Sequence, residues 1–175
     1  MQYKMKNSKK GYIWIVRVIL IVLIIMWMST IFGFSAEDGE QSQSFSDRIT
    51  IKVVKILKSD YDSLNSDKQE EFFNKVSFAV RKTGHFGEYG ILGILFACLL
   101  MTFEKVRKYN KKEMKLIFMT AAICMIYAAT DEFHQGFVAG RSSGVWDVVI
   151  DTLGGTVGAA MVSVVALFVA KKRNA

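Results

Sequence analysis

Residues 12–34, YIWIVRVILIVLIIMWMSTIFGF, decide the fold of this chain. A single charged side chain, Arg17, interrupts the run, and it stands near the beginning. An α-helix rises about 1.5 Å per residue, so roughly 20 apolar residues cross a hydrocarbon layer of about 30 Å. The run therefore predicts a helix that spans a membrane.

A cleaved signal peptide is the alternative for this first run, because four lysines within residues 4–10 would supply a positive leader. Signal peptides usually have an apolar core of about 7–15 residues followed by an A-x-A-like cleavage site. The apolar run is longer than that, and no such site follows it. We expect an uncleaved anchor.

Three further spans are predicted at about 84–103, 116–137 and 145–170. The third run is apolar only as far as Ala129, so it reaches spanning length only if the helix continues through Asp131 to Gln135. Hydrophobic residues make up 51% of the chain and proline is absent, so the helices need no proline kink. We predict one all-α domain over residues 1–175, an integral membrane bundle of four transmembrane helices, in which Cys98 and Cys124 serve packing.

Basic residues predict the direction of insertion. The segment through Arg17, the 104–115 loop and the 171–173 tail hold 14 of the 23 Lys and Arg but only 2 of the 16 acids. Short basic loops stay in the cytoplasm. We therefore expect a multi-pass protein of a bacterial cell membrane with both termini cytoplasmic, and we expect no nucleic-acid partner despite the net charge of +7.

The extracellular segment, residues 35–82, is too polar to span and is expected to carry one or two short amphipathic helices. Ile49, Val53 and Ile56 recur at helical spacing, with Lys52 and Lys55 on another face. This pattern suits a helix in the headgroup plane or a short helix packed on the ends of the spans, and both remain open.

Two local predictions concern the ends of helices in this segment. Residues 35–46, rich in Ser, Gln and acids, are expected to form a loop. Residues 66–69, Ser-Asp-Lys-Gln, match a capping box, with Ser66 as the N-cap of a helix that leads into the second span.

Ionisable residues in three of the spans are predicted to share one layer. Counting about 1.5 Å per residue up from the inner basic residues puts Glu88, Asp131 and Asp151 at similar heights, with both histidines slightly higher. Charged groups inside a membrane usually face the bundle interior or water and often mark function. We therefore expect a polar site at the extracellular edge of the bundle.

Spacing indicates which faces these groups share. Lys82, His85 and Tyr89 recur every three or four residues, and Asp147 and Asp151 are four apart. The stripe of the two aspartates continues through a Gly-x-x-x-Gly pattern at 154–158, which allows close helix packing, so the acids are expected to point into the bundle.

Simpler interpretations of the single residues also stay open. Asp147 and Asp151 could be ordinary residues of a helix end in contact with headgroups, and His85 could only bond a carbonyl. Arg141 is either a loop charge or a counter-ion of the acids, and we favour the counter-ion.

With these residues in view, the sequence resembles the VanZ-like family of small bacterial membrane proteins over roughly residues 30–160. The matching stretches are KTGHFGEYG at 82–90, TDEFHQGF at 130–137, GRSSGVWD at 140–147 and DTLGG at 151–155. One departure is Ala139, where the family usually has proline. The resemblance implies an envelope setting and an association with low-level resistance to the glycopeptide teicoplanin, but it supplies no reaction and no cofactor.

The first functional hypothesis is a non-enzymatic site that binds a cell-wall or lipid headgroup, with membrane lipids, a lipid-linked cell-wall precursor or a lipoglycopeptide as partners. Arg141 and Lys82 would hold a phosphate or carboxylate. The expected ligand-binding residues are Lys82, His85, Glu88, Tyr89, Asp131, Glu132, His134, Gln135, Arg141, Asp147 and Asp151.

The second hypothesis is an intramembrane hydrolase or transferase that acts on a lipid-linked substrate. Glu88, Asp131 and His134 are the candidates for acid–base catalysis. A divalent metal held by histidines and acids is a variant of this idea, but the two histidines lie on different spans, so we predict no metal site. Transport through the layer is a third possibility, weakened because the inner parts of all four spans are apolar.

Overall fold

The computed structural model describes residues 2–107, 111–141 and 143–174, with side chains from residue 11 to residue 172 of these ranges. The described residues form helices and no strand. In chain order the elements are α1 (Gln2–Ala36), α2 (Gly39–Leu57), the 3₁₀ turn η1 (Tyr61–Ser63), α3 (Ser66–Met101), α4 (Glu104–Arg107), α5 (Lys112–Gln135) and α6 (Val145–Asn174).

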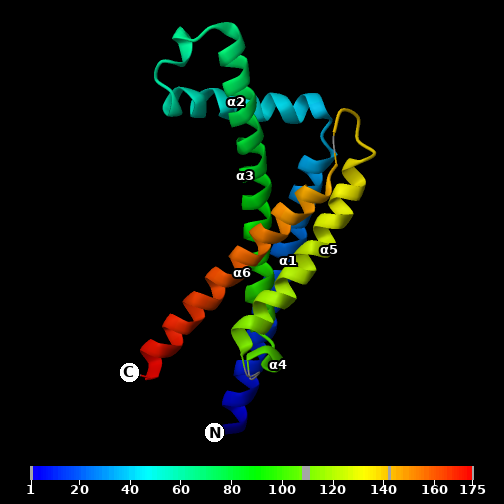
Figure 1. The fold of residues 1–175 in the computed structure, drawn as a ribbon. Helices are drawn as coiled ribbons and strands as arrows, with labels where there is room; N and C mark the ends of the chain where they lie inside the picture. The colour runs from blue at the N-terminus through cyan, green and yellow to red at the C-terminus, as the bar shows by residue number, and fades with distance from the viewer. Residues whose placement is uncertain (1, 108–110, 142, 175) are drawn as a thin grey trace.

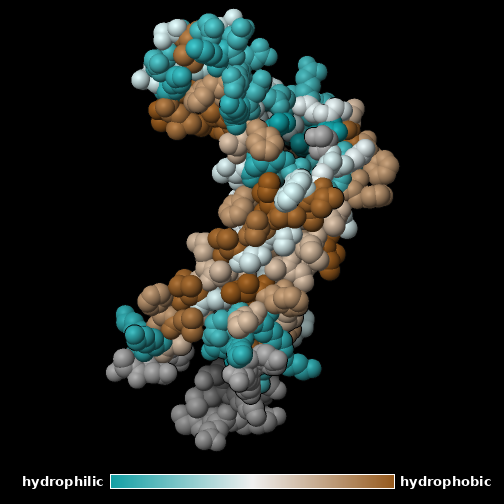
Figure 2. Space-filling model, viewed as in Figure 1, coloured by the Kyte–Doolittle hydropathy of each residue, from teal (hydrophilic) through white to brown (hydrophobic). Residues whose placement is uncertain are grey.

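Four helices are long and apolar enough to cross a membrane, which confirms the four predicted spans. They are the Gly11–Ala36 part of α1, α3, α5 and the Val145–Lys172 part of α6. Both termini and α4 lie at one end of the molecule, whereas α2 and the α5–α6 loop lie at the other, here called the far end (Figure 1). Hydrophobic residues cover the middle of the visible face between two more hydrophilic ends (Figure 2).

Glycines bring α3 and α6 into close contact. A Cβ added to Gly93 would overlap the backbone of Gly155, and one added to Gly158 would overlap the carbonyl of Gly90. Small residues allow helices in a membrane to approach closely, and van der Waals packing then holds them together. The predicted packing role of the 154–158 glycines is confirmed. Cys124 is fully buried in the same core, beside Tyr89 and Leu92.

Hydrogen bonds fix α1, whose apolar residues are mostly exposed, to the other helices at several heights. The Arg17 guanidinium donates to Thr102, and the Trp27 indole nitrogen donates to the carbonyl of Glu88, 2.9 Å away. The Tyr127 hydroxyl donates to the carbonyl of Met28. Exposed apolar side chains suit contact with lipid, while these bonds set the position of α1 against α3 and α5.

The predicted loop at residues 35–46 is wrong, because α1 continues to Ala36 and α2 begins at Gly39. The turn between them is short because Asp38 caps α2, its side chain accepting a hydrogen bond from the backbone of Gln41. Gly39 also donates to the carbonyl of Ala139, 3.0 Å away, which ties α2 to the α5–α6 loop. The polar composition of residues 35–46 therefore indicates exposure to water, and it does not indicate that the segment is non-helical.

The predicted capping box is shifted by one residue. Asn65, and not Ser66, is the N-cap of α3, and its side chain accepts from the backbone of Lys68. The Gln69 amide donates to the carbonyls of Tyr61 and Leu64, so it fixes the preceding turn. The prediction that this helix leads into the second span is confirmed, because α3 is continuous from Ser66 to Met101.

The third spanning helix continues through residues 131–135, as it must to reach the length that crosses a membrane. α5 includes Asp131 and His134 and ends at Gln135, two residues before the predicted boundary. Gly136 caps the end through a bond to the carbonyl of Glu132. The acidic and imidazole side chains of this turn are therefore held by regular helix.

Candidate functional site

A cavity of about 130 Å³ lies at the far end, between α1, α2, α3, α5 and the loop that carries Arg141. One side of it is polar, with His85, Glu88 and Asp131 in the lining. The α1–α2 part of the lining is mixed, with Ser35, Glu37, Ser42 and Ser46 beside apolar side chains. The apolar residues of the lining, here called the apolar wall, are Ile31, Phe34, Phe45 and Ile49 of α1 and α2 and Val80 of α3.

A second cavity of about 430 Å³ adjoins the first and is mostly polar. The two share Ser42, Arg81, His85 and Arg141 in their linings. The shared residues place two guanidinium groups at the junction of an apolar-walled cavity and a polar one.

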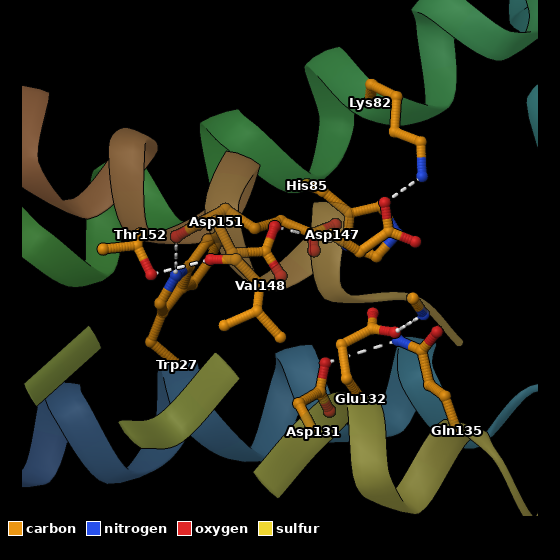
Figure 3. Close-up of polar contacts among 12 residues, drawn as sticks. Trp27, Lys82, His85, Asp131, Glu132, Gln135, Asp147, Val148, Asp151 and Thr152 are labelled. Atoms are coloured by element: carbon orange, nitrogen blue, oxygen red, sulfur yellow. Dashed lines mark hydrogen bonds and ion pairs between the residues drawn. The ribbon is translucent and has the colours of Figure 1, made fainter. Parts of the chain in front are cut away.

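Lys82 forms an ion pair with Asp147 across the α3–α6 contact (Figure 3). Both side chains are largely buried, with 25% and 14% of their surfaces exposed. A buried charge needs a partner because removal from water is costly, so each of these groups compensates the other. Lys82 is therefore already neutralised, although the sequence indicated it as a ligand-binding cation.

His85 approaches the second aspartate of α6. Its Nδ1 atom lies 3.8 Å from Oδ1 of Asp151, whose side chain is fully buried. Neither carboxylate oxygen of Asp151 has a hydrogen-bond partner within the described residues. The face of α6 that bears the aspartates thus points into the bundle, as predicted. Asp151 is next to His85 but does not line either cavity.

Two more acids line the first cavity with unused hydrogen-bonding capacity. Asp131 is only 2% exposed and accepts a weak bond from Gln135 at 3.4 Å, while its Oδ1 has no partner among the described residues. The Glu88 carboxylate, in the same lining, makes no hydrogen bond or ion pair within the described part of the chain. Buried polar atoms are nearly always hydrogen-bonded in native proteins, so Oδ1 of Asp131 is suited to a donor of a bound molecule, and the half-buried Glu88 carboxylate beside it is free to accept another.

Arg141 holds the turn between α1 and α2. Its guanidinium donates to the carbonyl of Glu37 at 3.1 Å, to Ser42 Oγ at 3.0 Å and to the carbonyl of Phe34. It lies in the same cavity lining as Glu88, but it forms no ion pair with an acid in the described ranges. The contacts of Arg141 in the described ranges are thus with two backbone carbonyls and a hydroxyl, and its role as a counter-ion of the acids stays a prediction.

Four of the predicted ligand-binding residues, Asp151 among them, stand outside both cavity linings. The His134 ring packs on Phe32, with 4.4 Å between ring centroids. Tyr89 is fully buried, and Glu132 accepts a hydrogen bond from the backbone of Gly144 at 2.9 Å, which fixes the start of α6. Tyr89, Glu132 and His134 each keep one buried polar atom without a hydrogen-bond partner within the described residues, so their role in binding stays a prediction. Ser142, in the loop motif, lies outside the described residues.

Arg81 is the site residue that the sequence analysis missed. It lines both cavities and, unlike Lys82, forms no hydrogen bond or ion pair within the described residues. Its spacing to His85 and Glu88, four and seven residues, places all three on one helical face, so the periodicity could have found it. No group of three or more metal-ligating side chains is arranged to hold a metal ion in the part of the chain described.

Four helices long and apolar enough to span a membrane, with a charged cavity at one end of the bundle, define a small multi-pass membrane protein. The family model described as VanZ/LLP1 matches residues 20–167, which is most of the chain. The chain belongs to the VanZ/LLP1 family, as its motifs indicated. Neither a curated protein nor a solved structure matches it.

Proposed function

We propose that this protein binds the anionic headgroup of a lipid or cell-wall compound at the extracellular edge of the bundle. The observation that carries the proposal is the position of Arg81, a cation without a protein partner in the described residues, at the junction of two cavities. A guanidinium binds phosphate or carboxylate through paired hydrogen bonds. Lys82, which the sequence favoured for this role, is occupied by Asp147.

The acids deeper in the cavity complete the proposed recognition. Glu88 and Asp131 offer acceptor oxygens next to the two arginines. An anionic group at Arg81 and Arg141 would place the rest of a headgroup against these oxygens. Hydroxyl or ammonium groups are the donors that such oxygens bind, and both are common in lipid and cell-wall headgroups.

The proposed orientation puts both termini in the cytoplasm and the far end outside, because basic residues gather at the other end. We expect green fluorescent protein to fluoresce when fused after residue 175, and alkaline phosphatase to be inactive there. Inserted into the turn at residues 59–60, the two reporters should give the opposite results. Active phosphatase at residue 175 would contradict the orientation.

Replacement of Arg81 by glutamine is expected to weaken binding of glycerol 1-phosphate about tenfold or more, because one hydrogen bond to a charged group contributes roughly 1.5–3 kcal/mol. Binding would be measured on the full-length protein in lipid nanodiscs. Lys68→Gln serves as the matched control, since Lys68 is an exposed cation of α3 that lines neither cavity. Equal affinities of the Arg81→Gln and wild-type proteins would contradict the proposal.

The same variants extend the test to the drug association that the resemblance implies. A lipid-linked precursor held at this site would be shielded at the surface where a lipoglycopeptide acts. Any protection against teicoplanin that the wild-type protein gives should therefore be lost in Arg81→Gln and kept in Lys68→Gln, at matched protein levels in the membrane.

Acid–base chemistry on a lipid-linked substrate is the second candidate, favoured by the approach of His85 to the buried Asp151. A histidine oriented by a carboxylate is a common general base. His85 lines both cavities, whereas His134, the imidazole named from the sequence, packs on Phe32 outside them. Release of phosphate from a bound phosphomonoester by the wild-type protein, but not by His85→Gln, would favour this candidate over simple binding.

A further inference from the structure

We infer that the ligand of this site is a whole phosphorylated lipid, with its chain on the apolar wall under α2 and its phosphate at Arg81 and Arg141. This inference rests on the proposed function and names its ligand class. The lipid would enter sideways from the outer leaflet.

The cavity combines the apolar wall with a buried acid. Phe34, Phe45 and Ile49 line it while 45%, 62% and 40% of their surfaces stay exposed. Asp131, which is only 2% exposed, lines the same cavity with an unpartnered oxygen. A small polar headgroup would satisfy the acid and leave the apolar wall uncovered, whereas an amphiphile satisfies both sides.

The direction of α2 also favours a lipid. This helix runs crosswise to the spanning helices at the level where they reach the far end (Figure 1). Such a helix is placed at the boundary between headgroups and acyl chains if the spans cross the bilayer. The cavity beneath its first half would then be at the height of lipid phosphates and of the upper part of their chains.

Apolar residues of α2 continue as a stripe beyond the cavity. Phe45, Ile49, Val53 and Ile56 are spaced at four, four and three residues, so they share one face of α2. Ile56 is 82% exposed, and hydrophobic residues appear on the underside of the part that projects from the bundle (Figure 2). The wall of the cavity is therefore one end of a surface suited to hydrocarbon.

Charge supports the same occupant. Lys52 and Lys55 are exposed beside the stripe, where their long side chains can reach lipid phosphates while the apolar face meets the chains. Arg81 and Arg141 stand at the cavity itself. Cations therefore accompany the apolar stripe from its exposed end to the cavity.

The inference is tested by a larger side chain in the apolar wall, which reduces the space for a lipid chain and leaves the charged residues unchanged. Ile49→Trp would occupy the space of the chain, and Ile51→Trp is the matched control, because Ile51 is 50% exposed on another face of α2 and outside the lining. Full-length protein in nanodiscs would be titrated with phosphatidic acid, glycerol 1-phosphate and inorganic phosphate. Native mass spectrometry would count the bound lipid.

We expect Ile49→Trp to lower the affinity for phosphatidic acid at least tenfold while the affinity for glycerol 1-phosphate stays within twofold. Ile51→Trp should bind both as the wild-type protein does. Equal phosphatidic acid binding by the two tryptophan variants, or binding of the two soluble phosphates without phosphatidic acid, would overturn the inference and leave the proposed function in place. Failure of all three probes to bind the wild-type protein would overturn both.

Discussion

Replacement of Gly93 by alanine is expected to lower the stability of the folded bundle by about 1–3 kcal/mol, the usual range for overpacking a close contact. The added methyl group would overlap the backbone of Gly155, which cannot turn aside as a flexible side chain can. α3 and α6 would have to separate along their interface. Thermal unfolding of the purified protein in a fixed detergent measures the loss, and we expect the transition temperature to fall by several degrees.

Gly87→Ala is the control for this experiment. Gly87 is also in α3, but a Cβ there would have no contact within 4 Å. Alanine is the better helix former, by roughly 1 kcal/mol in water, so this variant should be unchanged or slightly stabilised. The two substitutions are chemically identical and are expected to differ in sign. Similar losses in both variants would show that helix backbone effects, and not the α3–α6 contact, determine the result.

The four glycines of the second span show how far a sequence pattern can be taken. They recur at Gly84, Gly87, Gly90 and Gly93, which predicts a packing face, but only the last two face α6 at short distance. α3 still contacts α6 at the height of Gly84, through Lys82 and His85, so Gly84 and Gly87 lie on another face of α3 and not beyond the contact. The glycines at 154–158 predict which face of α6 packs on another helix, but they do not predict how α3 is aligned along that face.

The spans themselves could be predicted because one physical requirement dominates them. Hydrocarbon thickness sets a length and excludes charge, so apolar runs decide the spans, including the polar end of α5. No comparable requirement acts on residues 35–46. There Asp38 and the bond between Gly39 and Ala139 decide where the helix begins, and the second of these depends on residues about 100 positions away.

The candidate site was predictable as a layer of polar groups but not as a set of contacts. Helical spacing placed Asp151 and His85 at the bundle interior, and the structure brings them near each other. The alignment of α3 against α6 decides which cation has an acidic partner. In the structure Lys82 pairs with Asp147, whereas Arg81 lines the cavities. Tertiary alignment of this kind cannot be read from spacing along one helix.

Arg141→Ala is expected to have the largest effect on the site, because one side chain joins three points of the far end. It would remove bonds to the carbonyls of Phe34 and Glu37 and to Ser42 Oγ. Hydrogen bonds to a charged group contribute roughly 1.5–3 kcal/mol each, although their contributions do not add fully. The turn between α1 and α2 would loosen, and with it the apolar wall of the cavity. We expect a fall in thermal stability together with at least a tenfold loss of affinity for glycerol 1-phosphate.

Arg141→Lys tests whether Arg141 acts through its three hydrogen bonds or only through its positive charge. Lysine keeps the charge but is a compact ammonium group, so it lacks the planar fork that reaches two carbonyls and a hydroxyl at once. We therefore expect Arg141→Lys to behave like Arg141→Ala, while Ser42→Ala, which removes one of the three acceptors, loses only about 1–2 kcal/mol of stability. Arg48→Ala, an exposed arginine of α2, should change stability by less than about 0.5 kcal/mol. Wild-type stability and affinity in Arg141→Lys would contradict this prediction. They would mean that the positive charge, and not the three hydrogen bonds, is what position 141 contributes.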